Sequence, residues 1–218
     1  MNQKTDIEYL EDFIHSNPEL ERLESLVDEF NIFTSLKIID AEIRHSNFLA
    51  WLLDPSETHG LGSYFLKSFL KRVAYRASQV VLEYPTIFEV DGWDLDQAEV
   101  YREWRNIDIL IADSANRFAC VIENKITSSE HSSQLQRYKE IVDAEYPKYR
   151  KLLLYLTVEG ETPSDSSYLP ISYSYVIPLI DHLIQTKESK ASKEILNFIS
   201  HYREMVRKGS IMGSRLNF

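Results

Sequence analysis

The segment "NIDILIADSANRFACVIENKI", residues 106–126, constrains the fold of this chain more than any other stretch. Two apolar runs rich in β-branched and aromatic residues flank the polar turn "SAN", a pattern typical of a β-hairpin. A symmetric turn centred between Ala115 and Asn116 pairs residues whose numbers sum to 231. In that register Asp108 lies directly opposite Glu123, although most of the segment is apolar enough for a protein core.

The same register separates the charged residues Asp108, Glu123 and Lys125 from the apolar ones. Side chains alternate along a strand, so these three share one face of the hairpin. Like charges directly opposite each other destabilise a sheet, so the two carboxylates require a compensating cation. The other face is expected to carry a continuous apolar core: Ile107, Ile109, Ile111, Phe118, Cys120 and Ile122.

A divalent metal ion is the natural cation for two facing carboxylates. Mg²⁺, with Mn²⁺ as its expected substitute, takes oxygen ligands and commonly binds one or two carboxylates with water and substrate phosphates. Lys125 reaches the same pocket, where it either helps to deprotonate a water or neutralises charge on a phosphate. The pattern favours metal-dependent phosphodiester hydrolysis. An ordinary strand-end salt bridge between Glu123 and Lys125 stays open as the alternative.

Gln134 is a further candidate because it lies on the helix expected after the lysine strand. In "EHSSQLQRY", Glu130, Gln134 and Tyr138 fall at positions i, i+4 and i+8, which is one stripe of a helix. Such a helix begins near the end of the strand and crosses back over the sheet, which brings Gln134 to the pocket. A solvated stripe fits the spacing equally well.

The helix expected at "AEIRHSNFLAWLL" offers an acid from a distant part of the chain. Glu42, His45 and Ser46 share one face of this helix. Glu42 can supply an extra metal ligand through a water molecule. A simple exposed helix face is the alternative that the sequence leaves open.

The rest of the chain predicts helices first and strands later. Cap signals, including Asp40, and helical spacing predict helices over residues 5–16, 18–30, 39–55 and 63–77. Runs of β-branched and aromatic residues predict strands within 79–90 and over 98–104, 106–113, 117–125, 151–158 and 171–177. The remaining helices are expected over 128–146, 178–187 and 191–207, and a loosely ordered tail over 208–218.

This order predicts one α/β domain with a mixed central sheet. The 218 residues suffice for one large domain with a substantial core, and no internal boundary is evident. The expected parts are an N-terminal helical extension, a core, and C-terminal helices with a tail, over residues 1–38, 39–180 and 181–218.

Composition indicates a cytoplasmic protein. Hydrophobic residues make up 44% and charged residues 27%, which is typical of globular domains. No apolar run approaches the roughly 20 residues that span a bilayer, and the polar start "MNQKTDIEYL" is unlike a signal peptide. The lone cysteine, Cys120, is expected to fill the core, with a redox or nucleophilic role as the alternative.

The net charge of −10 limits how this chain meets a polyanion. Nucleic acid must meet a local basic patch, metal ions, or a homodimer or partner protein that supplies positive charge. The fourth helix has a basic side that is either solvated or bound to phosphate, formed by Lys67, Lys71, Arg72 and Arg76. The candidate nucleic-acid contacts are Lys67, Lys71 and Arg105.

The chain resembles the PD-(D/E)XK nuclease superfamily in three motifs, "IDILI…VIENKI…E…QLQRY", "AEIRHSNFLAWLLDP…HGLG" and "YREW". It is most similar to an uncharacterised bacterial branch with the Q-x-x-x-Y helix that RecB-like nucleases also carry. The similarity runs from about residue 30 to about residue 180 and implies a restriction-endonuclease-like αβββαβ core. Two departures are Ile107, where the family name has proline, and Glu103, an extra acid without an assigned role.

The resemblance also implies a role for each candidate residue. It makes Asp108 and Glu123 metal ligands and makes Lys125 the residue that assists the water. It makes the backbone carbonyl of Asn124 and the helix acid Glu42 further metal ligands. It makes Gln134 and Tyr138 residues that orient the site or touch the nucleic acid.

Two functions of different classes follow from these observations. The first is a Mg²⁺-dependent nuclease acting on DNA in preference to RNA, in genome defence or repair by analogy with the family. No aromatic platform of single-strand binders, helix-turn-helix or zinc-binding spacing is evident in the sequence. The second is a nuclease-like fold that works as a catalytically weak or inactive binding or assembly subunit, which the negative charge favours.

Overall fold

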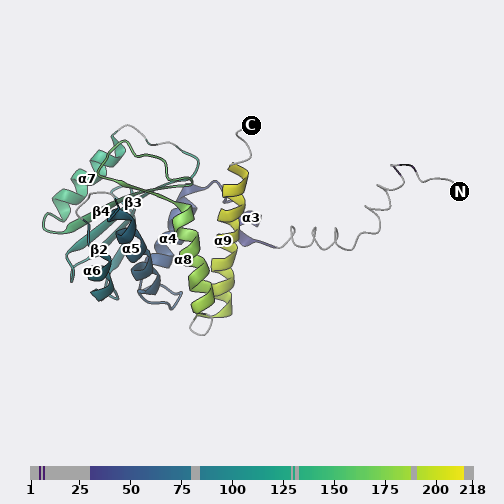
Figure 1. The fold of residues 1–218 in the computed structure, drawn as a ribbon, viewed down its shortest axis with the longest axis horizontal. Helices are drawn as coiled ribbons and strands as arrows, with labels where there is room; N and C mark the ends of the chain where they lie inside the picture. The colour runs from purple at the N-terminus through teal and green to yellow at the C-terminus, as the bar shows by residue number, and fades with distance from the viewer. Residues whose placement is uncertain are drawn as a thin grey trace.

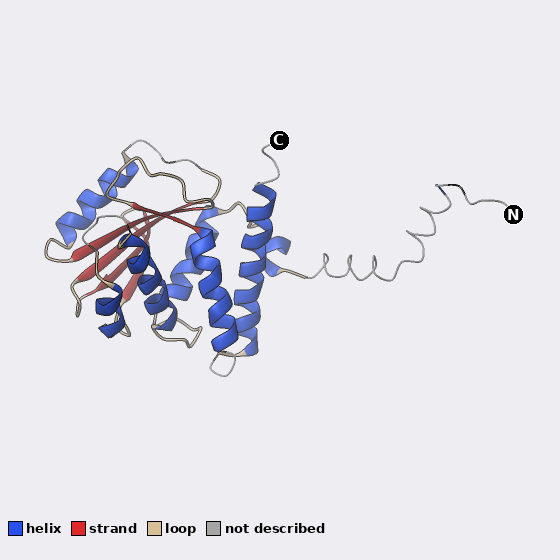
Figure 2. Cartoon of the chain, viewed as in Figure 1, coloured by secondary structure: helices blue, strands red, loops and turns tan. Residues whose placement is uncertain are grey.

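Five strands form one mixed sheet in the computed structural model of the chain, which describes residues 5, 7, 30–79, 84–128, 130, 133–187 and 191–213. Strands β1 to β5 lie side by side in chain order, with bounds Glu99–Trp104, Ile107–Asp113, Phe118–Lys125, Arg150–Thr157 and Leu169–Ser172. β1, β2 and β3 pair antiparallel, whereas β3, β4 and β5 pair parallel. The predicted α/β fold with a mixed sheet is confirmed (Figure 2).

Helices cover both faces of the sheet (Figure 1). The connection between β3 and β4 forms α7, Gln134–Glu145, which lies on one face. The other face is covered by helices that precede and follow the strands in the sequence: α4 Glu42–Leu53, α5 Tyr64–Ala77 and α8 Tyr173–Thr186. Outside them lies α9, Lys193–Gly213, against α8 and the short α3, Ile32–Ser35. None of the described helices is long and apolar enough to cross a membrane.

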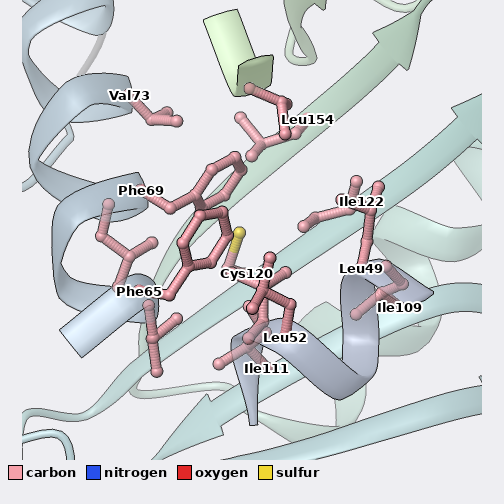
Figure 3. Close-up of a cluster of buried hydrophobic side chains, with 14 of the residues drawn as sticks. Leu49, Leu52, Phe65, Phe69, Val73, Ile109, Ile111, Cys120, Ile122 and Leu154 are labelled. Carbon is pink, nitrogen blue, oxygen red and sulfur yellow. The ribbon is translucent and has the colours of Figure 1, made fainter. Parts of the chain in front are cut away.

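The larger core fills the space between the sheet and α4, α5 and α8 (Figure 3). It contains the predicted apolar face of the hairpin with one exception: Ile109, Ile111, Phe118, Cys120 and Ile122. The exception is Ile107, which packs with Leu110 in the smaller core under α7. The prediction for Ile107 is wrong because strand pairing is interrupted next to it, at Asp108, so the regular alternation does not extend to Ile107.

Cys120 is fully buried among these apolar side chains. Burial raises the pKa of its thiol, which disfavours the reactive thiolate. The prediction of a core-filling cysteine is therefore confirmed, and the structure offers no support for a nucleophilic role.

The β2–β3 hairpin has the predicted register. Its paired residues include Ile109 with Ile122 and Ile111 with Cys120, and each pair sums to 231. The turn is closed by the carboxylate of Asp113, which accepts the backbone N–H and the side-chain amide of Asn116 through Oδ1, each at 2.7 Å.

The one or two strands predicted within residues 79–90 are not found among the described residues: 84–86 have no regular structure, and 87–90 are helical. Residues 87–92 form α6, Ile87–Gly92, which begins with a capping box. Thr86 Oγ1 accepts the backbone N–H of Glu89, and Glu89 Oε2 accepts that of Thr86 at 2.7 Å. This cap outweighs the β-branched composition, and residues 80–83 lie outside the described part of the chain.

The strand predicted over residues 171–177 is correct only for its first two residues. β5 ends at Ser172, and α8 begins at Tyr173, five residues before its predicted start. The buried residues of α8 recur at helical spacing, Tyr173, Val176, Ile180 and Leu183, which the alternating pattern of "ISYSYVI" obscures. Pro178 is accommodated inside the helix.

The N-terminal predictions are partly outside the described residues, because residues 8–29 are not described and the first two predicted helices fall almost wholly there. The predicted helix at α4 is confirmed, but its cap is not: Ala41 occupies the N-cap position without a side-chain hydrogen bond, so Asp40 does not cap it. The short α3 was not predicted, and its cap is the side chain of Asn31.

The C-terminal tail is more helical than predicted. α9 continues to Gly213, six residues beyond the predicted end of the last helix. Residues 214–218 lie outside the described part of the chain.

Candidate metal and catalytic site

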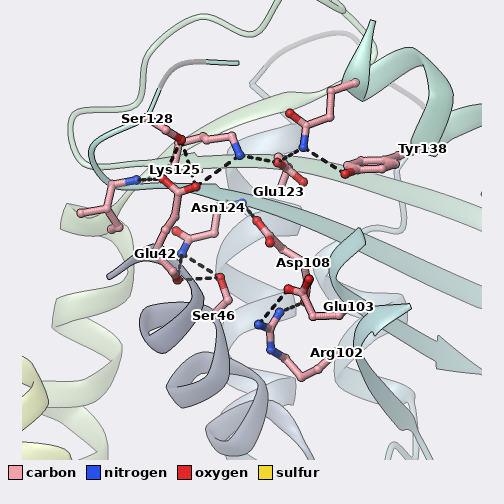
Figure 4. A network of polar contacts seen from close by, with 12 residues as sticks. Glu42, Ser46, Arg102, Glu103, Asp108, Glu123, Asn124, Lys125, Ser128 and Tyr138 are labelled. Carbon is pink, nitrogen blue, oxygen red and sulfur yellow. Dashed lines mark hydrogen bonds and ion pairs between the residues drawn. The ribbon is translucent and has the colours of Figure 1, made fainter. Parts of the chain in front are cut away.

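Two strand carboxylates lie together near the end of β3, where Lys125 is the last residue of the strand (Figure 4). Asp108 stands in register with Glu123, one position beyond the last residue pair of the hairpin. In place of a further ladder bond, Asp108 Oδ2 accepts the backbone N–H of Asn124 at 2.8 Å. Glu123 is fully buried. The hairpin thus brings together the two acids that the sequence singled out.

The surroundings of these carboxylates disfavour two full negative charges. Burial raises the pKa of Glu123, and the nearby charge of Asp108 raises it further. Burial also raises the pKa of Asp108, although the N–H of Asn124 and the charge of Lys125 act in the opposite direction. The pair therefore needs a proton or a cation beside it, which is the electrostatic condition expected of a metal site.

Lys125 supplies a cation from within the chain. Its Nζ lies 2.7 Å from Glu123 Oε1 and 3.4 Å from Glu42 Oε1. Burial opposes the charged ammonium, but the contact with Glu123 and the charges of Glu42 and Asp108 outweigh burial and raise the pKa of Lys125. The side chain is therefore a firmly held ammonium ion. Of the two roles left open for Lys125, charge neutralisation fits this state.

Glu42 reaches the end of β3 from α4 (Figure 4). Its Oε2 accepts the backbone N–H of Ile126 at 2.9 Å, and both carboxylate oxygens accept the hydroxyl of Ser128. Burial raises the pKa of Glu42, but these hydrogen bonds and Lys125 outweigh burial and lower it. Within the described residues, no three acidic, histidine or cysteine side chains converge as a ligand set. The role of Glu42 as a metal ligand stays a prediction.

Gln134, the first residue of α7, does reach the pocket. Its Nε2 donates to Glu123 Oε1 at 2.7 Å and approaches the hydroxyl of Tyr138 at 3.0 Å. Both side chains are buried, so Tyr138 contacts Gln134 and not a surface. The predicted stripe is wrong for Glu130, because the helix starts after Ser133, whose φ is 62°. Glu130 instead accepts the backbone N–H of Ser164.

Asn124, between the acid and the lysine, is anchored by its side chain to two helices. Its Nδ2 donates to Ser46 Oγ of α4 at 3.0 Å, and its Oδ1 accepts the hydroxyl of Tyr173 of α8 at 2.9 Å. These bonds fix the "ENK" segment against the helical layer. They also use the face of α4 that the sequence singled out, since Ser46 lies one turn from Glu42.

His45 has a structural role. Its Nδ1 lies 3.1 Å from the hydroxyl of Tyr202, and its Nε2 lies 2.7 Å from the carbonyl oxygen of Ile39. Burial lowers its pKa, so the ring stays neutral in the core. Of the three residues predicted to share one face of α4, Glu42 and Ser46 contact the site, whereas His45 packs beside it.

The residues fit a divalent cation. Glu123 Oε2 and Gln134 Oε1 are buried oxygen atoms without a hydrogen-bond partner in the described part of the chain. A buried acceptor without a donor costs free energy, and carboxylate and amide oxygens are the ligands that Mg²⁺ takes. Asp108, close to Glu123, carries a second carboxylate at the same place.

Two of the predicted nucleic-acid contacts lie far from this pocket. Lys67 donates to the carbonyl of Trp93 at 2.9 Å, and Lys71 pairs with an acid of α6 at 2.6 Å. Trp93 packs against Phe118, the first residue of β3, whereas Lys125 is the last. Seven strand residues separate these ends by about 23 Å. A direct role for Lys67 or Lys71 at the reacting phosphate has no support in this geometry.

Arg105 lies in the two-residue turn between β1 and β2. Both Arg105 and Asn106 have positive φ, the geometry of a tight hairpin turn. The guanidinium lies over the ring of Trp104, 4.7 Å from its centroid, and pairs with Glu145 at 3.1 Å. Arg105 is exposed, and its partner Glu145 is the last residue of α7, whereas Gln134, which reaches the pocket, is the first.

Three residues that shape the site were missed in the sequence. The hydroxyl of Ser128 donates a hydrogen bond to Glu42, and the hydroxyl of Tyr173 donates one to the side-chain oxygen of Asn124. Arg102 donates one to the backbone carbonyl of Asp108. Ser128 follows Lys125 closely, which is a weak local signal. The other two contacts join distant segments, and no spacing pattern in the sequence marks them.

A mixed sheet flanked by helices, with two acids and a lysine at adjacent strand positions, defines the restriction-endonuclease-like class of fold. The chain belongs to the PD-(D/E)XK nuclease superfamily, whose family model matches residues 30–216. Members of this superfamily are generally nucleases that use a divalent metal. Searches of curated proteins and of solved structures return no significant match.

Proposed function

We propose that this protein is a metal-dependent nuclease that hydrolyses phosphodiester bonds, in DNA rather than RNA, with Mg²⁺ as its cofactor and Mn²⁺ as a substitute. The observation that carries the proposal is the buried Glu123 carboxylate, whose Oε2 has no partner among the described residues while Asp108 and Lys125 lie beside it. The chain carries this costly charged cluster in the segment that resembles the family's motif.

Each residue of the pocket has a role in this proposal. Asp108 and Glu123 hold the cation, with the carbonyl of Asn124 as a further ligand. A bound Mg²⁺ supplies positive charge beside the scissile phosphate and acidifies a water molecule. Gln134 orients Glu123 through its 2.7 Å hydrogen bond, and Glu42 contributes a ligand from α4 through a water molecule.

Lys125 acts as a charged donor. Its ammonium lies 2.7 Å from Glu123 and keeps its proton, so it can donate to a phosphate oxygen. Hydrolysis forms a bond from the water oxygen to phosphorus and breaks the bond from phosphorus to one ester oxygen, which leaves with the proton that the water gives up. Between these two events negative charge gathers on the phosphate oxygens. A fixed cation stabilises that charge more than it stabilises the ground state.

The Gln134–Tyr138 contact supports membership of the branch with the RecB-like Q-x-x-x-Y helix. The proposal takes the whole chain as one nuclease-like domain of a bacterial cytoplasm. Its net charge of −10 repels nucleic acid, so the cation, a second copy or a partner protein provides the missing positive charge. Two residues are proposed to act on the nucleic acid: Arg105, from the β1–β2 turn, and Tyr138, indirectly through its contact with Gln134.

A second candidate function is a binding or assembly subunit without appreciable activity. The ion pairs of Lys125 with Glu123 and Glu42 favour it, because they offset part of the pocket's negative charge without any metal. The acidic composition favours it as well.

Cleavage assays separate the two candidates. The purified protein is incubated with plasmid, single-stranded DNA and RNA, with Mn²⁺, with Mg²⁺ and with a chelator. The nuclease proposal predicts metal-dependent cleavage that Lys125→Ala abolishes and Lys151→Ala preserves, since Lys151 pairs with Asp143 away from the pocket. Cleavage that survives in Lys125→Ala would assign the activity to another site or to a contaminant.

A further inference from the structure

The strand pairing is interrupted on both sides of Asp108. On the β1 side, the paired positions pass over Glu103, which faces Asp108 in the register. Glu103 has a φ of 52°, in the left-handed region that residues other than glycine rarely adopt. On the β3 side, the pairs end at Ile109 with Ile122. Asp108 therefore lies in a gap of the sheet, where the ladder does not fix its backbone.

One side chain fills this gap. The Arg102 guanidinium donates through Nη1 to the backbone carbonyl oxygen of Asp108, which takes the place of a ladder bond (Figure 4). Its Nε donates to Asn47 Oδ1 at 2.9 Å, and its Nη2 reaches the carbonyl of Ile43 at 3.4 Å, both on α4. Nη2 also pairs with Glu103 at 3.0 Å. The guanidinium thus joins β1, β2 and α4.

We propose that Arg102 is a positioning residue that holds Asp108 in its ligand geometry and ties it to α4. This rests on the proposed function, in which Asp108 binds the cation. Arg102 fixes the backbone of Asp108, and the Asp108 carboxylate accepts the N–H of Asn124. The same helix carries Glu42, which contacts Lys125 from the other side. Helix α4 therefore braces both ends of the site.

The shape of arginine is needed for this task. A guanidinium presents several N–H groups in a rigid plane, and here they serve acceptors on three elements at once. An ammonium has the same charge but cannot span these acceptors. Arg102→Lys therefore keeps the charge and removes the geometry, whereas Arg102→Met keeps much of the side-chain bulk and removes both.

The test measures the site without relying on activity alone. Hydrogen exchange of the Asn124 amide is followed by NMR in metal-free protein, and Mn²⁺ affinity is measured by calorimetry. In Arg102→Met and Arg102→Lys, we expect faster Asn124 exchange, by about tenfold, as the acceptor carboxylate loses its fixed position. We expect Mn²⁺ affinity to fall about tenfold or more, and kcat to fall while KM for DNA stays near its original value.

A matched control comes from Arg150, which pairs with Glu89 at 2.7 Å near the opposite end of the sheet. Arg150→Met should leave the Asn124 exchange and Mn²⁺ affinity unchanged. Wild-type exchange and wild-type affinity in both Arg102 variants would overturn the inference. If the wild type itself binds no Mn²⁺ and cuts nothing, the proposed function fails, while the Asn124 exchange still decides whether Arg102 positions Asp108.

Discussion

Lys125 and Glu123 form a buried ion pair, with 2.7 Å between Nζ and Oε1 and side-chain exposures of 8% and 1%. Replacing either side chain alone leaves the other buried without its partner. Removal of one partner from such a pair costs about 3 to 5 kcal/mol. The pair therefore affects the stability of the fold as well as the candidate catalytic site.

The first prediction concerns the stability of this pair. Lys125→Met should lower the free energy of unfolding by about 3 kcal/mol, because Glu123 and Glu42 lose their cation. Combining it with Glu123→Gln should recover at least half of the loss, since the buried charge is then gone. Urea denaturation at about pH 9, above the raised pKa of Glu123, measures both.

Lys151→Met is the control for this cycle, since Lys151 pairs with the exposed Asp143 at 3.1 Å. That variant should change stability by less than about 1 kcal/mol. A Lys125→Met protein as stable as the wild type would contradict the buried ion pair.

The second prediction concerns pH. Burial raises the pKa values of Glu123 and Asp108 in the folded state, and the charge of Asp108 raises the pKa of Glu123 further. The folded protein then holds protons that the unfolded chain has released, so these two groups contribute stability that falls as pH rises from about 5 towards 8. The buried His45 and His59, whose pKa values are lowered, act in the opposite direction at the acidic end of this range. We expect a slope on the order of 1 kcal/mol per pH unit in metal-free protein.

Glu123→Gln isolates the source of this slope, because glutamine does not titrate. The variant should show a flatter dependence of unfolding free energy on pH over the same range, and saturating Mn²⁺ should flatten the wild-type curve. A pH dependence that is the same in wild type and in Glu123→Gln would mean that the Glu123 carboxyl group is not held as described.

The third prediction concerns the backbone at Glu103. Its positive φ is unfavourable for any residue with a side chain, so Glu103→Gly should be about 1 kcal/mol more stable than Glu103→Ala. Both variants lack the carboxylate, so their difference reports the backbone alone. Thermal or urea unfolding suffices, and an alanine variant equal to or more stable than the glycine variant would refute this reading of the β1 conformation.

Much of the site could be predicted because it depends on the period of a single hairpin. The number sum of 231 fixed which residues pair, and alternation placed Glu123 and Lys125 on the face covered by α7. Gln134 followed from the position of the next helix. These inferences need only local geometry, and local geometry is what a sequence encodes most directly.

The wrong predictions have a common physical cause: helix caps and long-range contacts decide these segments, and neither follows from local periodicity. The run after Pro85 and the run after Ser172 both contain β-branched or aromatic residues, yet a capping box and a helical stripe make them α6 and α8. The role of Arg102 has no signal in the sequence, because its hydrogen bond to the Asp108 carbonyl replaces a backbone bond that regular strand pairing would supply. Interruptions of regular structure carry no periodic signal.

The basic residues show the same limit. The spacing of Lys67 and Lys71 along one helix predicts a shared basic side, but the structure places both near the opposite end of β3 from Lys125. Spacing within a helix reports which side chains share a face. It does not report which end of the sheet that face approaches.

The central claim is that Asp108 and Glu123 together bind a divalent cation, and calorimetric titration with Mn²⁺ tests it most directly. Wild type and the exposed-acid control Asp91→Asn should each bind Mn²⁺, whereas Asp108→Asn, a variant of nearly the same shape, should lose the binding heat. Equal binding by wild type and Asp108→Asn, or no binding by the wild type, would contradict the claim.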